Sequence, residues 1–95
     1  MQITDAHRKK LSEMLHFALV EMRLLGWAGK SGQAADLADA FHNLPQDMWR
    51  DDFSLEFFRD AFLKVYQEKY PEGRVRNYVA IVDAMLAMGE DPGAN

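Results

Sequence analysis

Apolar side chains recur every three or four residues in four segments of this 95-residue chain. This is the spacing of amphipathic helices, and no segment sustains the alternation that a half-buried β-strand requires. The pattern predicts helices over about residues 5–25, 32–43, 55–70 and 74–88, with a flexible tail at 89–95. Short links favour an antiparallel helical hairpin at the start of a small all-α, four-helix bundle. The length fits a single domain over residues 1–95.

Polar residues and chain breakers set the expected ends of these helices. The expected N-caps are Thr4 or Asp5, Ser31, and Asp52 or Ser54. Gly26 and Gly29 are expected to end the first helix, since glycine readily adopts the left-handed position that follows a helix. Pro45 should stop the second helix, with Asn43 as its C-cap, because the residue before a proline is pushed out of helical geometry.

The first helix carries two apolar faces, at about 100° per residue. One stripe is Leu11, Met14, Leu15, Ala18, Leu19, Met22 and Leu25, and Phe17, Val20, Leu24 and Trp27 lie nearly opposite. A helix that is apolar on two sides is either sandwiched between other helices or exposes one face to a partner. The partner face would suit a homodimer. The third helix should bury a single stripe of Leu55, Phe58, Phe62, Val65 and Tyr66.

The charge balance and the absence of cysteine narrow the classes of function. Fifteen acidic against eleven basic side chains give a net charge of −4, which disfavours nucleic-acid binding even though Arg74-Val-Arg76 precedes a helix. No stretch approaches the roughly 20 apolar residues of a membrane span. The chain has no cysteine, so thiol chemistry and disulfides are excluded. We therefore expect a cytoplasmic protein without a membrane or nucleic-acid partner.

Two carboxylate–histidine pairs share the spacing of a metal-binding helix: Glu13-x-x-His16 and Asp39-x-x-His42. Further ligands would have to come from Glu56 or Asp60 and from Asp83. However, Glu13 and His16 lie opposite the Leu11–Leu25 stripe, and Asp39 and His42 flank the Leu37–Phe41 face, so neither pair projects into the bundle interior and surface ion pairs are the simpler interpretation. No serine stands in a nucleophile-elbow pattern, and the GKSG turn lacks the spacing of a phosphate loop. We therefore expect that the protein is not an enzyme and binds no cofactor or metal. A metal-binding helical bundle is the less favoured alternative.

Residues 45–60 combine aromatic and acidic side chains. The aromatic residues can close one end of the bundle while the acids favour the start of the third helix. Alternatively, they form an acidic surface with aromatic anchors that suits a basic protein partner. The residues expected to bind such a partner are Trp49, Asp51, Asp52, Phe53, Glu56 and Asp60.

The run from Glu21 to Trp49 contains RLLGWAGK and DLADAFHNLP. It resembles a segment of small uncharacterised bacterial all-helical proteins, some of them encoded beside toxin or secretion-system genes. Over about a third of the chain it is loosely similar to helical immunity proteins. The resemblance implies a bacterial, non-enzymatic module for protein–protein interaction, such as an inhibitor of a basic toxin domain. The alternative is a homodimeric structural or regulatory protein.

Overall fold

The computed structural model describes residues 3–71 and 77–88, and within these ranges the chain is helical and contains no strand, as the sequence predicts. The elements are α1 (Asp5–Trp27), α2 (Ser31–Phe41), α3 (Leu44–Asp47), α4 (Leu55–Phe58), the π-helical turn η1 (Arg59–Leu63), α5 (Lys64–Lys69) and α6 (Tyr78–Ala87). The predicted Arg74-Val-Arg76 start of the last helix and the tail at 89–95 lie outside the described residues.

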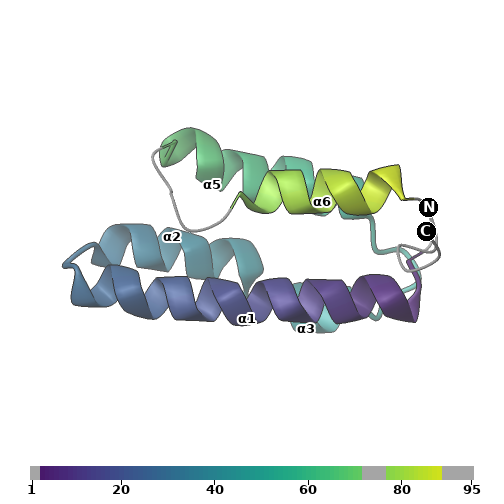
Figure 1. Ribbon diagram of the computed structural model, residues 1–95, viewed down its shortest axis with the longest axis horizontal. Helices are drawn as coiled ribbons and strands as arrows, with labels where there is room; N and C mark the ends of the chain where they lie inside the picture. Colours follow the sequence, from purple (N-terminus) through teal and green to yellow (C-terminus); the bar gives the residue numbers. More distant parts are fainter. Residues whose placement is uncertain (1–2, 72–76, 89–95) are drawn as a thin grey trace.

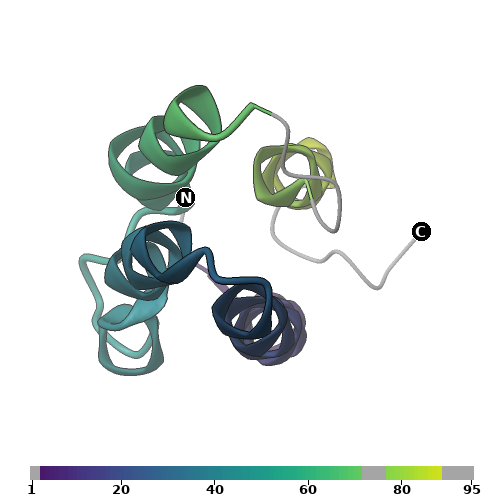
Figure 2. The same cartoon turned by 90° about the vertical axis from the view of Figure 1, so that its left-hand side faces the viewer.

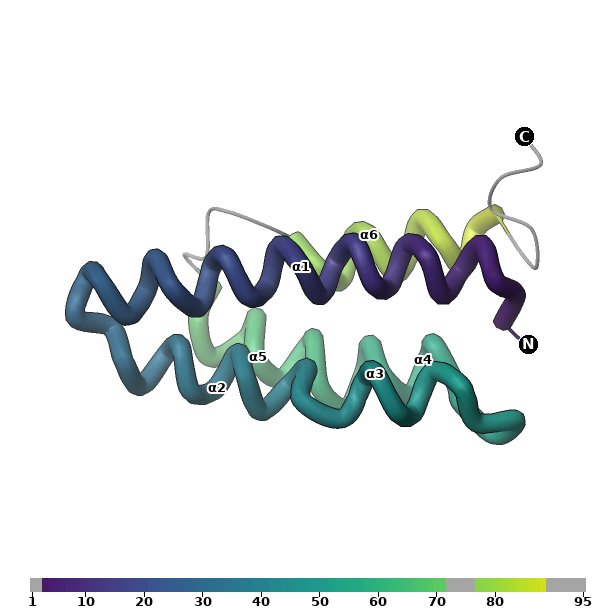
Figure 3. The backbone as a smooth tube through the Cα atoms, turned by 90° about the horizontal axis from the view of Figure 1, so that it is seen from below, coloured from purple at the N-terminus to yellow at the C-terminus, as the bar shows by residue number. Residues whose placement is uncertain are grey.

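The helices lie along the long axis of a body that measures 40 × 24 × 20 Å (Figure 1). After the turn at residues 28–30, α2 lies against the C-terminal half of α1, and α3 continues along its N-terminal half (Figure 3). An end-on view places α1, α2, α5 and α6 around a common centre (Figure 2). The fully buried ring of Phe41 in α2 meets the rings of Phe58 in α4 and Tyr78 in α6 at centroid distances of 5.7 and 5.1 Å.

Side-chain caps begin three of the helices. The hydroxyl of Thr4 accepts a hydrogen bond from the backbone N–H of His7, whose ring accepts one from the Thr4 backbone in return, so Thr4 is the cap of α1. The hydroxyl of Ser54 accepts the Phe57 N–H at 3.1 Å and caps α4. Asn77 caps α6 in the same way. The prediction of Ser31 as a cap is wrong, because Ser31 is already the first helical residue of α2.

This difference between the two serines is measurable. We expect Ser54→Ala to lower the free energy of unfolding by about 1 kcal/mol, since an amide at the start of α4 loses its acceptor. Ser31→Ala is the matched control and should change it by less than about 0.5 kcal/mol, as for other surface substitutions. Both changes in the free energy of unfolding are measured by urea unfolding, with the m-values of the variants equal to that of the wild type. Equal losses for the two variants would contradict the assignment of the cap.

Pro45 does not end α2, contrary to the sequence-based prediction. α2 already ends at Phe41, with His42 rather than Asn43 in the C-cap position. Pro45 instead lies in the first turn of α3, where a missing backbone N–H leaves no intrahelical bond unmade. This extra turn directs the chain from α2 toward residues 48–54 and lines one side of the site described below.

The π-helical turn η1 changes which side chains of the third helical segment reach the core. The buried residues are Leu55, Phe58, Leu63 and Tyr66. The step of five residues between Phe58 and Leu63 would be about 140° out of line in a regular α-helix at 100° per residue. A π turn bonds residue i to i+5 and brings them back into line. Beyond Phe58 the predicted α-helical stripe is therefore wrong at Val65, which is 58% exposed, whereas Phe62 lies at the edge of the core and Tyr66 is buried as predicted.

The two predicted faces of α1 have different environments. Leu11, Met14 and Ala18 are buried, but Leu19, expected in the same stripe, is 56% exposed. At 100° per residue, Leu19 lies at one margin of the stripe. On the second face, Val20 is half-buried, whereas Phe17, Leu24 and Trp27 are exposed, Trp27 to 73%. The interpretation that α1 is sandwiched is therefore wrong, and its second apolar face meets solvent.

A carboxyl group lies in the core, where the sequence pattern did not place one. Glu21 of α1 is only 2% exposed, and its carboxyl oxygen accepts a hydrogen bond of 2.5 Å from the hydroxyl of the fully buried Tyr78 in α6. A buried polar group without a partner would be costly. This bond therefore connects the first and last described helices and satisfies the carboxyl group at the same time.

Candidate functional site

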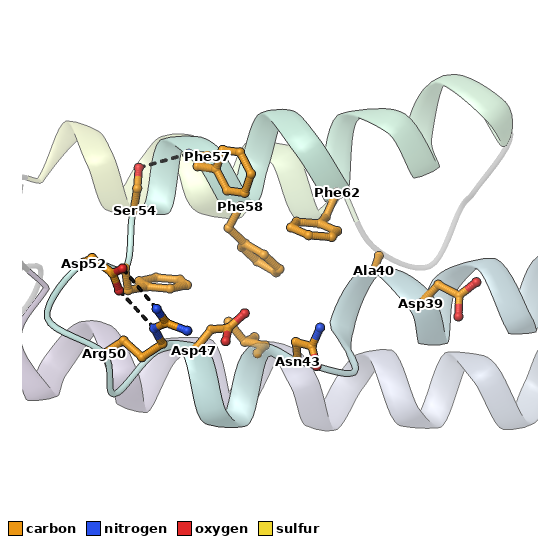
Figure 4. A pocket seen from close by; sticks show the side chains of 12 residues that line it. Asp39, Ala40, Asn43, Asp47, Arg50, Asp52, Ser54, Phe57, Phe58 and Phe62 are labelled. Carbon is orange, nitrogen blue, oxygen red and sulfur yellow. Dashed lines mark hydrogen bonds and ion pairs between the residues drawn. The ribbon is translucent and has the colours of Figure 1, made fainter.

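A groove of about 200 Å³ opens between α2–α3 on one side and α4–η1 on the other (Figure 4). Its apolar lining consists of Ala40, Leu44, Phe53, Phe57, Phe58 and Phe62. Its polar lining consists of Asp39, Asn43, Asp47, Arg50, Asp52 and Ser54. Figure 4 shows the rings of Phe58 and Phe62 pointing from the upper helix toward Asn43 and Asp47 on the lower segment. The groove therefore has an aromatic floor and a mainly acidic rim.

The π turn accounts for the aromatic floor. Phe57 and Phe62 are five residues apart, a spacing that a regular α-helix would place on different sides and that the π turn aligns. Their rings meet edge-on with centroids 6.0 Å apart. Phe58 lies 6.1 Å from Phe62 and 6.3 Å from Phe53, so the four rings form one connected cluster. Phe57 stays 64% exposed at the mouth of the groove.

Two of the rim carboxylates have no ion-pair partner among the described residues. Asp52 is paired, because both of its carboxylate oxygens accept hydrogen bonds from the Arg50 guanidinium, at 3.0 and 3.1 Å. That pairing holds the pKa of the Asp52 carboxyl below its usual value and raises the pKa of Arg50. Asp39 and Asp47 form no such pair within the described ranges. With the Asp52–Arg50 pair neutral overall, the rim carries a negative charge at Asp39 and Asp47.

A second cavity of about 260 Å³ lies beside the groove, between α2 on one side and η1 and α5 on the other. It shares Asp39, Ala40 and Phe62 with the first cavity and adds Asp36, Ala61, Val65, Tyr66 and Lys69. Asp36 is engaged there: Lys69 approaches its carboxylate at 2.8 Å, and the hydroxyl of Tyr70 donates a hydrogen bond to it. The hydrogen bond from Lys69, followed by that from Tyr70, lowers the pKa of Asp36.

The structure brings together only part of the residues predicted to bind a partner. Asp52 and Phe53 line the groove. Trp49 lies outside it, 63% exposed, with the guanidinium of Arg8 stacked 4.8 Å from its ring centroid. Asp51 and Glu56 are exposed and do not line the groove. The carboxylate of Asp60 is neutralised elsewhere, by Arg59 at 2.8 Å and Lys64 at 3.4 Å.

Other groove residues were not among those predicted. The sequence patterns indicate Asp39 as a metal ligand in the less favoured alternative and Phe62 as a core residue, and Phe57 and Asp47 fall within residues 45–60 without being among the predicted binding residues. Asp39 comes from α2 and reaches the site through the packing of α2 against η1. No local pattern in the sequence signals that contact.

The proposed metal pairs do not converge. Glu13, His16, Asp39 and His42 are all exposed. Nδ1 of His42 lies 3.2 Å from the backbone oxygen of Asp39, not from its carboxylate. Asp83, considered as a further ligand, pairs with Arg59 at 2.9 Å. In residues 3–71 and 77–88, no three histidine or acidic side chains gather closely enough to hold a metal ion.

Within these same ranges, no helix combines the length and the apolar character needed to cross a bilayer. Comparisons of the chain with protein-family models, curated proteins and solved structures returned no match.

Proposed function

We propose that this chain is a non-enzymatic protein-binding module whose groove takes a basic segment of another protein. The observation that carries the proposal is the pairing of a connected aromatic floor with two rim carboxylates, Asp39 and Asp47, that lack ion-pair partners among the described residues. Aromatic anchors supply binding energy in such interfaces, and complementary charge supplies specificity and fast association. The supporting framework is a four-helix bundle that begins with an antiparallel hairpin of α1 and α2.

The size of the groove favours side chains over a whole small molecule. Pockets for small ligands usually enclose about 300–1,000 Å³ and bury most of the ligand. The open cavity of about 200 Å³, taken by itself, is smaller and suits one or two side chains of a larger partner. A cytoplasmic inhibitor that covers a basic toxin domain, as immunity proteins do, is the particular version of this function that we favour.

The test is capture of a partner from the source cell with charge-matched variants. Asp39→Asn with Asp47→Asn removes two rim charges while preserving side-chain shape. Glu13→Gln with Glu68→Gln removes two exposed charges away from the groove and is the control. We expect the wild type and the control to retain one stoichiometric basic protein at low salt. The groove variant should retain at least about tenfold less of that protein. Equal retention by both variants would contradict the proposal.

Self-association through α1 is a second candidate function, favoured by its exposed apolar face. Phe17, Val20, Leu24 and Trp27 are spaced by three, four and three residues, as in the seam of a coiled coil. The guanidinium of Arg23 lies 5.1 Å from the Trp27 ring centroid, so the end of the face is already shielded on one side. Exposed apolar faces of this kind mark interaction sites.

Sedimentation tests this second candidate directly. A homodimer predicts dimeric mass at micromolar concentration, and Leu24→Glu should convert it to monomer because the seam would bury a charge at each subunit. Leu24 is exposed, so the variant should keep its fold. A wild-type chain that stays monomeric at high micromolar concentration would exclude the homodimer as a function of this chain.

A further inference from the structure

We propose that the occupant of the groove is a basic amphipathic helix that presents apolar side chains over two turns, at positions i, i+3 or i+4, and i+7. This inference rests on the proposed function, and it names the conformation and chemistry of the partner segment. It draws on the extent of the groove, the backbone available beside it, and the position of its free charges.

The apolar surface extends over two adjacent cavities. The cavity of about 200 Å³ and the cavity of about 260 Å³ meet at Asp39, Ala40 and Phe62, which line both. Phe57 lines only the first cavity and Val65 only the second, and both side chains are mainly exposed. Eight residues separate them, or about 12 Å at 1.5 Å per helical residue. An occupant must therefore cover two turns of helix to use both cavities.

The backbone around the groove favours a helical occupant. One way in which an extended peptide binds is by adding a strand to an exposed sheet edge, and the described residues contain no sheet. Residues i and i+7 of a helix lie about 10.5 Å apart on one face, close to the separation of the two exposed anchors. A helix in an apolar groove uses this pattern of anchors.

The position of the charges favours a basic segment. Asp39 stands where the two cavities meet, and Asp47 stands at the first. The cations of the groove are already engaged, Arg50 with Asp52 and Lys69 with Asp36. An acidic segment would meet two negative charges without a free cation, whereas Lys or Arg beside the apolar face would pair with Asp39 and Asp47. Like charges brought together at an interface disfavour binding.

A displayed library of 16-residue helical peptides provides the probe. The full chain is used as bait, and the consensus peptide is then titrated by fluorescence anisotropy. We expect a consensus with apolar residues at i, i+3 or i+4, and i+7 and with flanking Lys or Arg. Its affinity should fall at least about tenfold for Asp39→Asn with Asp47→Asn and by less than about twofold for Glu13→Gln with Glu68→Gln.

Val65→Ser tests the second cavity separately. Val65 is exposed, so the substitution should leave the fold intact, and it lies outside the first cavity. We expect about fivefold weaker binding of the consensus peptide, since one apolar contact is lost. Unchanged binding would overturn the two-cavity arrangement. A consensus without helical spacing, one that is acidic, or one that tolerates a central proline would overturn the proposal as a whole.

These outcomes are distinct from failure of the proposed function. If the Asp39 and Asp47 variant loses a cellular protein but the library yields no basic helical consensus, the groove binds a protein and the helical occupant is wrong. If the consensus peptide binds with the expected dependence but no cellular protein requires the groove, the inferred occupant chemistry holds and the proposed cellular function is wrong.

Discussion

Phe41→Ala is expected to lower the free energy of unfolding by about 3–5 kcal/mol, because Phe41 is fully buried and its ring contacts rings from two other helices. Domains of this size are stable by about 5–15 kcal/mol in total. The variant should therefore unfold at a much lower urea concentration or be largely unfolded in water. Circular dichroism during urea unfolding measures the loss.

Phe57→Ala is the control, since it removes the same side chain from the mouth of the groove. Phe57 is mainly exposed, so we expect a change below about 1 kcal/mol. Comparable losses for the two substitutions would mean that the ring of Phe41 does not hold the helices together. Because Phe41 also supports Phe58, which lines the groove, Phe41→Ala should weaken any binding at the groove as well.

Tyr78→Phe is expected to lower the free energy of unfolding by about 1–3 kcal/mol. The substitution removes the hydroxyl that donates to Glu21 and leaves a buried carboxyl group without this hydrogen bond. The ring itself is kept, so the change isolates the polar contribution. Tyr70→Phe is a suitable control, because it also removes a hydrogen bond to a carboxylate, Asp36, but at the partly exposed end of α5. We expect about 0.5 kcal/mol there.

A double-mutant cycle identifies the origin of this loss. Glu21→Leu with Tyr78→Phe removes both polar partners, and such a pair of changes can be nearly neutral. The double variant should therefore be more stable than the sum of the single losses predicts. Strict additivity would show that the two groups do not depend on each other.

Local signals in the sequence predicted the helices and part of their ends. Thr4 and Ser54 stand where a side-chain oxygen can accept the amide three residues later, and both act as caps. Ser31 stands in an equally plausible position, but the chain enters α2 one residue earlier than the pattern indicates. Pro45 fits either the stop of one helix or the first turn of the next, and only the packed structure decides between them.

The site was less accessible to prediction, because it depends on contacts between distant parts of the chain. The acidic and aromatic character of residues 45–60 was visible, and Asp52 and Phe53 lie in the groove as members of that region. Asp39 reaches the groove from α2, through a contact between helices that no spacing of residues in the sequence indicates. Likewise, no local pattern indicates that Glu21 is buried, since its partner Tyr78 lies 57 residues away in the sequence.

The π turn has a consequence for how this surface could arise and be lost. It accommodates one more residue than a regular helical turn. A chain one residue shorter between Phe58 and Leu63 would continue as a plain α-helix with its inner face in line. In that chain Phe57 and Phe62 would be four residues apart, a spacing that still places two side chains on one face of an α-helix. The aromatic floor could therefore arise in a chain of either length, and other proteins with the same groove should be recognised by paired aromatic residues four or five positions apart, not by the length of this interval.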